Sequence, residues 1–340
     1  MTIRSIVALG LVATSCGAGS DGRDGPDADT DIDGDTDADS DVDGDSDSDP
    51  CEHPAEPVPC KGAPRPGGDM LDGEVCVPGG WFRMGLEDPP IGADDTDPAR
   101  WVYESPLFMD AYPVTVERYT ECSDEGVCPP PWDIAPCEEG SGGPCDPLEP
   151  NTPAYHFWSS ARAFCEWDVR DGGAARLPTE AEYERAAYGL GCKPRSYPWG
   201  DEPATCAHVC AEYYDDNRVK GPDPPECDLG NRCPVDSRPL GASPDGLAAL
   251  LGGHYTWTMD CYLGWYYRLA LEHDESRDPV CDETSAVKEC AECGPGHERT
   301  YRGVDGNPIA VPTYHLSARY RWAADVTESA AGFRCVRDAS

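Results

Sequence analysis

Cysteine is the residue that most constrains what this chain can fold into. The sequence contains 19 cysteines, and 18 of them remain when Cys16, near the N-terminus, is set aside. An even number of thiols at this density is typical of proteins that fold outside the cytosol, where thiols close as disulfides. The 36 glycines and 35 prolines lie between short apolar pieces. We therefore expect a loop-rich fold with modest regular structure, held together by as many as nine disulfides.

Two groups of cysteines also combine with a histidine, which leaves zinc binding open as an alternative. They are Cys290 and Cys293 with His297, and Cys206 and Cys210 with His208. Thiolate and imidazole are the ligands that zinc prefers, but neither group has a second ligand pair at zinc-finger spacing. An oxidising compartment favours disulfides at these positions.

The N-terminal residues have the layout of a bacterial lipoprotein signal. Arg4 precedes an apolar run over residues 6–13, and the run ends in Ala13-Thr14-Ser15-Cys16. Cleavage before Cys16 would leave a thiol for lipid attachment, whereas an ordinary secretory signal with a chance cysteine is the alternative. No later apolar run reaches the roughly 18 residues that a spanning helix needs. We therefore expect residues 1–16 to be a signal peptide with its lipobox, and the lipid on Cys16 to hold the exported chain on a membrane.

Gly17 follows Cys16, where inner-membrane retention signals have an aspartate. By that resemblance, we expect the protein in the bacterial outer membrane.

Aspartate dominates the next segment, residues 17–50, which holds 14 Asp and one Arg. From Asp27 to Asp49 it occupies every second position, so the segment has no apolar face to bury and should be a disordered linker. An EF-hand is the alternative reading of Asp29 and Asp31, but its twelfth position is Ser40 instead of the glutamate that calcium requires. The net charge of the whole chain is -39, which disfavours nucleic acid as a partner.

Residues 51–71 are rich in proline and contain two cysteines, which suggests a stapled stalk before one domain over residues 72–338. Within that domain we expect a helix over residues 159–169, where apolar residues recur at three- and four-residue spacing. A second helix should begin after Thr179, which forms a capping box with Glu182. Residues 81–84, 299–302 and 332–336 are predicted strands.

Several segments of the domain carry a family resemblance when they are taken in order. They are Gly79-Gly80-Trp81-Phe82-Arg83-Met84-Gly85, Tyr112-Pro113-Val114-Thr115-Val116, Arg176-Leu177-Pro178-Thr179-Glu180-Ala181-Glu182-Tyr183-Glu184, Tyr197-Pro198-Trp199-Gly200-Asp201-Glu202, Trp257-Thr258-Met259-Asp260, Arg302-Gly303 and Gly332-Phe333-Arg334-Cys335. In this order the chain resembles the formylglycine-generating enzyme (sulfatase-modifying factor) family over residues 74–338. The resemblance implies an α+β, loop-rich fold related to C-type lectin domains. It further implies a disulfide between Cys165 and Cys335.

The resemblance also implies a copper site, from which this sequence departs. The family's oxidases hold copper with two cysteines upstream of the closing Gly-Phe-Arg-Cys segment. When Arg319-Tyr320-Arg321 is placed on the family's basic and aromatic run, Ser317 and Trp322 occupy the two cysteine positions. A hydroxyl and an indole are poor ligands for a soft cuprous ion, so we expect no copper-dependent oxidation of cysteine.

A calcium-binding segment of the family is altered as well. It corresponds here to residues 252–257, in which Gly253 replaces a family asparagine and Thr256 replaces a carboxylate ligand. A threonine hydroxyl carries no charge, so we expect any structural calcium there to be weakened.

Aromatic and basic side chains give the remaining candidate site. Its members are Trp257, Tyr262, Arg302, Arg319 and Trp322. By the resemblance, the aromatic ones at 257 and 262 lie where the family has its pocket wall, and the others lie in the segments that follow. Aromatic faces beside guanidinium donors suit a peptide or a glycan, although each ring could equally be part of the core. The leading hypothesis is a surface lipoprotein whose domain binds such a ligand without catalysis. The alternatives are a diverged oxidoreductase with another metal or substrate, and a structural envelope protein.

Overall fold

The computed structural model describes residues 53, 56–87, 94–130, 149–169, 173–192, 195–210, 233–252, 255–294, 296–303, 320–323 and 331–339; for 320–323 it describes only the backbone. The expected lipid signal, the aspartate-rich linker and Cys51 lie outside these residues. All of the described residues belong to one compact unit.

Three small antiparallel sheets form the framework of this unit. The first joins β1 (Glu74–Val77), β4 (Leu107–Asp110) and β8 (Val336–Asp338) in the order β1-β4-β8. The second pairs β2 (Gly80–Met84) with β3 (Arg100–Glu104). The third has the order β5-β6-β7 and contains β5 (Thr256–Cys261), β6 (Glu298–Arg302) and β7 (Tyr320–Ala323). The chain is therefore a mixed α+β fold, as expected.

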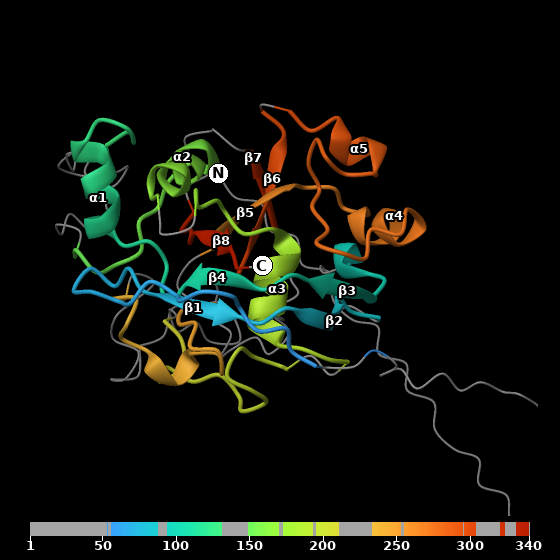
Figure 1. The fold of residues 1–340 in the computed structure, drawn as a ribbon, viewed down its shortest axis with the longest axis horizontal. Coiled ribbons are helices and arrows are strands. Elements are labelled where there is room, and N and C mark those ends of the chain that lie inside the picture. The colour runs from blue at the N-terminus through green and yellow to red at the C-terminus, as the bar shows by residue number, and fades with distance from the viewer. Residues whose placement is uncertain are drawn as a thin grey trace, which may run out of the picture. The chain divides into compact units, whose positions relative to one another are not determined.

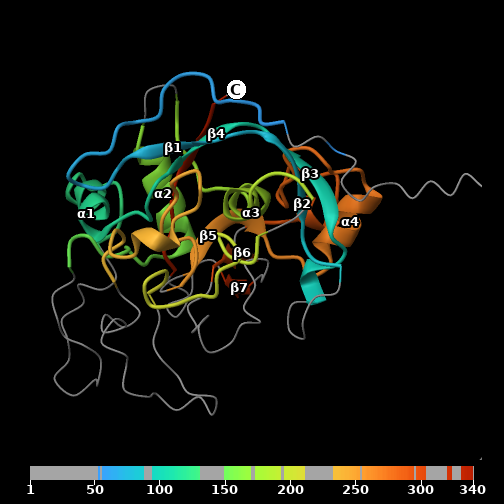
Figure 2. The ribbon, with the colours of Figure 1, turned by 90° about the horizontal axis from the view of Figure 1, so that it is seen from below.

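Five α-helices of the described residues pack among these sheets. They are α1 (Val116–Asp124), α2 (Trp158–Trp167), α3 (Glu180–Tyr188), α4 (Tyr266–Glu272) and α5 (Lys288–Ala291). Short 3-10 helices cover Asp94–Thr96 and Pro239–Gly241. Helix α3 lies near the centre of the unit, with α1 and α2 on one side and α4 and α5 on the other (Figure 1). Strands β1 and β4 run along one side of α3, as a view from below shows (Figure 2).

The central helix begins as the sequence predicts. The Thr179 hydroxyl accepts from the Glu182 backbone N–H at 3.1 Å, and the Glu182 carboxylate accepts from the Thr179 backbone N–H at 2.7 Å. These two bonds satisfy donors that the first turn of a helix leaves without partners. All nine residues of α3 are buried, because the helix has a core on more than one side.

The core consists of three clusters. Tyr183, Ala186 and Ala187 of α3 pack with β1 and β4. Ala181, at the start of the same helix, packs with Phe82 and with α4 in a second cluster. The third cluster surrounds α1 and α2. Helix α3 thus ties two of the clusters together, which explains why small alanine side chains recur on it.

The predicted helix over residues 159–169 is confirmed as α2, which ends two residues earlier, at Trp167. The predicted strands at 81–84 and 299–302 are confirmed as β2 and β6. The strand expected at 332–336 is displaced, because β8 spans Val336–Asp338. Ala331 and Gly332 make only isolated bridges, and the partners of β8 on β4 begin at Met109.

Disulfides between described cysteines include six pairs whose separations run from 6 to 170 residues. These pairs are Cys60–Cys76, Cys122–Cys128, Cys165–Cys335, Cys210–Cys233, Cys261–Cys293 and Cys281–Cys290. The pairing of Cys165 with Cys335 is therefore confirmed, and it joins α2 to the segment just before β8. Cysteines of both candidate zinc groups are oxidised, including Cys206, so the disulfide interpretation is the one that the structure supports.

Residues 56–71, which the sequence assigns to a stalk, lie against the domain. Val58 bridges Gly79, and Cys60 is joined to Cys76 of β1. The Arg65 side chain bonds Asp168 at 2.9 Å at the end of α2. This stretch therefore shares contacts with both the first sheet and α2.

Candidate functional site

Trp257, the first aromatic candidate, is part of the core. It lies on β5, has no exposed surface, and its indole N–H donates to the His156 carbonyl at 2.8 Å. The Tyr301 ring packs edge-on against it, with centroids 5.5 Å apart. An indole whose faces and N–H are both engaged in the interior presents nothing to solvent.

Arg302 is also buried, where it pairs with two carboxylates of α3. Its guanidinium lies 2.8 Å from Glu180 and 2.6 Å from Glu184, and it bonds the Tyr267 hydroxyl at 3.2 Å. Burial alone would lower the pKa of Arg302, but these carboxylates raise it well above its usual value. The charged guanidinium therefore fastens β6 to α3, and the structure brings Trp257 and Arg302 to the interior rather than to a surface.

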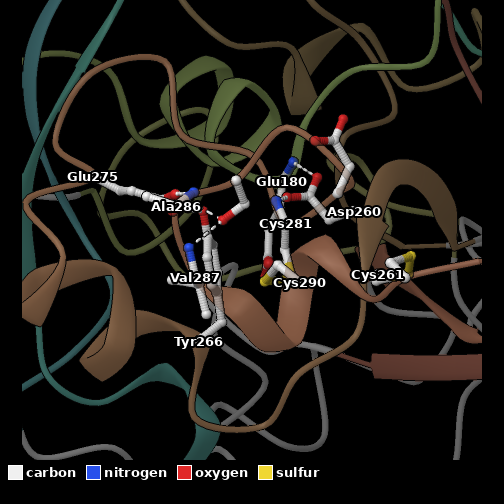
Figure 3. The surroundings of a disulfide bond; sticks show 12 residues. Glu180, Asp260, Cys261, Tyr266, Glu275, Cys281, Ala286, Val287 and Cys290 are labelled. Carbon is white, nitrogen blue, oxygen red and sulfur yellow. Dashed lines mark hydrogen bonds between the residues drawn. A yellow bond between two sulfur atoms is a disulfide. The ribbon is translucent and has the colours of Figure 1, made fainter.

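A second buried carboxylate positions the start of α3. Asp260 of β5 accepts from the backbone N–H of Glu180 at 2.7 Å and from that of Cys281 at 2.9 Å. Because Cys281 is joined to Cys290, this carboxylate links α3 to the disulfide region (Figure 3). On the far side of that region Glu275 accepts from the Tyr266 hydroxyl at 3.0 Å. These hydrogen bonds give the carboxylates of Asp260 and Glu275 a structural role.

The other candidates are spread over the chain. Tyr262 follows β5 and donates its hydroxyl to Asp95 at 2.9 Å. Ser317 and Arg319 lie outside the described residues. Trp322 is opposite Arg299 in the β6–β7 register, and only its backbone is described.

The donors present do not fit a copper site. The sequence contains no cysteine between Cys293 and Cys335. Every cysteine in the described part of the chain is in a disulfide, so none of them offers a thiolate. The described residues also contain no cluster of three or more His, Cys, Asp or Glu side chains suited to a metal ion.

The calcium segment lacks its charged ligand. Thr256 is fully buried at the start of β5, opposite Arg302, while Gly253 lies outside the described residues. A buried neutral hydroxyl beside an arginine does not fit the carboxylate position of a calcium site.

A small cavity adjoins the Cys210–Cys233 disulfide, and its lining includes His208 and Arg238. Its volume is about 20 Å³, which is room for a single water molecule. A sugar or a peptide side chain does not fit there.

One surface of the structure does gather aromatic rings and guanidinium groups. On the paired strands β2 and β3, Trp81 is opposite Tyr103 and Arg83 is opposite Trp101. The rings of Trp81 and Tyr103 meet edge-on, with centroids 5.6 Å apart. We refer to these four side chains, together with Arg277, as the aromatic face.

The aromatic face is not among the sites expected from the sequence, although the sequence contains a signal for it. Trp81 and Arg83 alternate with buried Phe82 and Met84 on β2, as in a strand with one face toward solvent. Residues 100–104 repeat the alternation on β3. What the sequence lacks is any sign that Arg277 joins them, because it is more than 170 positions from Tyr103, the β3 residue that it bridges.

The described residues contain no helix of the length and apolar character that a membrane span requires.

The comparisons with known proteins agree with the fold. The chain is similar to the formylglycine-generating enzyme of Thermomonospora curvata, at 30% identity over 318 residues, covering 79% of this chain and 95% of the relative. It is also similar to the inactive C-alpha-formylglycine-generating enzyme 2 of Mus musculus, at 29% identity over 231 residues, covering 55% and 68%.

Among solved structures, PvdO from Pseudomonas aeruginosa shares the fold, with a TM-score of 0.57 and 21% identity, covering 83% of this chain and 99% of that one. The family described as "Sulfatase-modifying factor enzyme 1-like domain" matches residues 61–339. The chain therefore belongs to the sulfatase-modifying factor family, whose relatives include the formylglycine-generating enzymes.

Proposed function

We propose that this protein is a family member that does not oxidise cysteine with copper and that acts instead as a ligand-binding module of the cell envelope. The observation that carries the proposal is the absence of any cysteine between Cys293 and Cys335, the stretch where the resemblance places the copper ligands. Replacement of a single ligand would weaken a copper site. Replacement of the whole thiolate pair removes the soft donors on which cuprous ion depends.

The state of the other cysteines supports the same proposal. The fourteen cysteines of the described residues are all oxidised, so none can take the place of the missing pair without reduction of a disulfide. Cys335, the last residue of the family's closing segment, is completely buried with Cys165 of α2 as a disulfide in the core. The fold is therefore retained through structural sulfur, with no free thiol left for chemistry in this part of the chain.

The relative in mouse that is named an inactive enzyme supports the proposal from another direction. It is consistent with a family in which the scaffold persists after the oxidase activity has been lost. Fold alone does not decide activity, so the assignment depends on the donor atoms that a particular chain provides.

The test is direct measurement of copper binding and of turnover. The purified full-length protein is titrated with cuprous ion against a competing chelator and incubated with a sulfatase-type peptide that contains the target cysteine. The Thermomonospora curvata enzyme serves as the positive control. We expect no stoichiometric copper binding and no conversion of cysteine to formylglycine, as read by peptide mass; conversion above the uncatalysed level would refute the proposal.

Metal analysis of the same natively purified sample tests the alternative oxidoreductase. Stoichiometric iron or another transition metal, together with oxygen consumption in the presence of the peptide, would favour that alternative.

We also propose that lipid on Cys16 anchors the domain to the outer membrane, with residues 17–50 as a spacer. The sequence Ala13-Thr14-Ser15-Cys16 and the following Gly17 support this placement. In a bacterial host fed labelled palmitate, the wild-type protein should carry the label and fractionate with outer membranes. The Cys16→Ser variant should carry none, and a labelled variant or an unlabelled wild type would contradict the proposal.

A further inference from the structure

The aromatic face is the outer side of a two-stranded sheet whose inner side is fully engaged. Phe82, Met84 and Val102 point into the core, where they meet α4 and the start of α3. Because successive residues of a strand point to opposite sides, Trp81, Arg83, Trp101 and Tyr103 point outward together, and all four are partly exposed. Packing in the core therefore explains the inner residues and leaves the outer ones unaccounted for.

Arg277 completes the aromatic face from a distant part of the chain. Its backbone bridges Tyr103, and its guanidinium lies 4.3 Å from the Tyr103 ring centroid and 5.3 Å from that of Trp81. Arg83 lies 5.9 Å from the Trp101 ring centroid. Cation–π contacts hold both guanidiniums over the rings while their N–H groups remain able to donate.

The ion pairs of the aromatic face are few. Arg83 pairs with Glu87, whose side chain is 62% exposed, and such pairs contribute little because water competes for both partners. None of the ion pairs between described residues includes Arg277. In a chain with 65 acidic and 26 basic residues, the exposed Arg277 is held by aromatic rings and has no carboxylate partner among the described residues.

His53 covers one end of the aromatic face. Its ring stacks on Trp81 with centroids 4.4 Å apart, and it meets the Trp101 ring in a T-shaped arrangement with centroids 4.8 Å apart. The remaining free surface thus lies along β3, from Trp101 toward Tyr103 and Arg277. Outward side chains that are two residues apart on a strand lie about 7 Å from each other. A single sugar ring can bridge that distance.

We propose that the aromatic face binds an acidic glycan. A pyranose ring stacks its apolar side on Trp101, and a carboxylate on the same or the next sugar accepts from the Arg277 guanidinium. Arginine is the donor best matched to a planar carboxylate, and an indole offers a wide apolar surface with little entropy to lose. This inference rests on the proposed function as a binding module, and it names the ligand class and the residues.

The charge distribution favours a sugar with isolated acidic groups over a nucleic acid. A nucleic acid needs a basic stripe along many phosphates, whereas the net charge of -39 opposes every polyanion at long range, so an acidic ligand with few charges is favoured here. The aromatic face offers two guanidiniums, and only Arg277 is without a carboxylate partner among the described residues. That arrangement suits one acidic group per bound segment.

The experiment is isothermal titration of the full chain, together with tryptophan fluorescence, using three probes. They are a short oligogalacturonate as a carboxylated glycan, a lightly sulfated dextran sulfate as a sulfated one, and dextran as a neutral one. We expect saturable binding of oligogalacturonate that weakens as salt is raised, and no binding of dextran. Saturable binding of dextran sulfate alone would identify sulfate as the acidic group and would still support the proposal.

Variants assign the binding to the aromatic face. Arg277→Gln keeps a polar side chain but shortens it and removes its charge, and we expect at least tenfold weaker binding. Trp101→Ala should weaken binding to a similar degree. The matched controls are Arg268→Gln and Trp265→Ala. The Arg268 side chain on α4 is 63% exposed, and Trp265, just before α4, is 61% exposed. Both variants should bind like wild type.

Near-UV circular dichroism and the urea midpoint confirm that each variant is folded. If Trp101→Ala is unfolded, Arg277→Gln alone decides the question, because it changes one exposed side chain. Equal binding by wild type and Arg277→Gln would overturn the proposal. Binding of dextran as tightly as of the acidic glycans would overturn it too, and so would binding of an acidic peptide but of no glycan. The absence of glycan binding would leave the copper assay unaffected, so the two proposals fail separately.

Discussion

His156 is a buried base whose environment makes stability depend on pH. It is 2% exposed, its ring stacks on Tyr119 with centroids 3.7 Å apart, and its Nε2 has no hydrogen-bond partner. Burial lowers the pKa of His156 to about 4. In an unfolded chain the histidine pKa is about 6.5, so between these values the unfolded state binds more protons.

The domain should therefore lose stability as the pH falls from about 6.5 to 4, by up to about 3 kcal/mol from this residue. His156→Phe keeps the ring stack and removes the titration. We expect urea-unfolding free energies of the variant to fall less than those of wild type across this window. Glu104, whose buried carboxyl has a raised pKa, contributes the opposite slope, but it is present in both proteins. Parallel pH curves for the two would contradict the assignment.

Arg302 provides a second prediction at the scale of one side chain. Arg302→Met leaves the buried carboxylates of Glu180 and Glu184 without their cation, and we expect a loss of about 3 to 5 kcal/mol in unfolding free energy. Arg268→Gln breaks an exposed pair with Asp97 and should cost less than about 1 kcal/mol. Similar urea midpoints for the two variants would mean that the network around Arg302 is dispensable.

The sequence predicted which kinds of residue form a site better than it predicted whether each side chain points into the core or outward. Trp257 and Trp81 are both aromatic residues of short strands, yet the first is in the core and the second is on the aromatic face. An aromatic ring gains free energy from burial and also suits a ligand, so composition does not separate the two outcomes. The alternation of exposed and buried residues on β2 can be read from the sequence. The residues that surround β5 come from distant parts of the chain, and the sequence does not show which they are.

At the scale of an element, α3 shows which features were predictable. Its capping box is local, and both of its hydrogen bonds form as expected. The last strand was misplaced by several residues, because its pairing partner β4 lies more than 200 positions earlier. Local hydrogen-bond signals are readable in one sequence, and register between distant strands is not.

Thr179→Ala tests the contribution of the capping box. Loss of the hydroxyl leaves the Glu182 backbone N–H without its acceptor, and we expect about 1 kcal/mol of destabilisation. Thr120→Ala is the control, because that hydroxyl bonds the Val116 carbonyl inside α1 and an alanine there favours the helix. Thermal unfolding should place the Thr179 variant below the Thr120 variant; the reverse order would show that tertiary packing alone sets the start of α3.

At the scale of the whole molecule, the disulfide that closes the longest loop among the described residues should make the largest difference to stability. Cys165–Cys335 closes a separation of 170 residues, and Cys122–Cys128 closes one of 6. On the chain-entropy account, the longer loop stabilises by about 3 kcal/mol more. Replacement of Cys165 and Cys335 by alanine should therefore lower the urea midpoint much further than the same replacement of Cys122 and Cys128. Equal losses would show that strain or packing, and not loop closure, determines the effect.

The first sheet brings together the beginning and the end of the domain, on either side of β4. Strand β4 lies between β1 and β8, and the Arg337 guanidinium of β8 is 2.7 Å from the Glu74 carboxylate of β1. During synthesis, β4 therefore keeps one edge unpaired until β8, more than 200 residues later, has been made. A ribosome-bound chain that has not yet reached β8 lacks one strand of the first sheet, so this sheet closes only after the other described elements have been made.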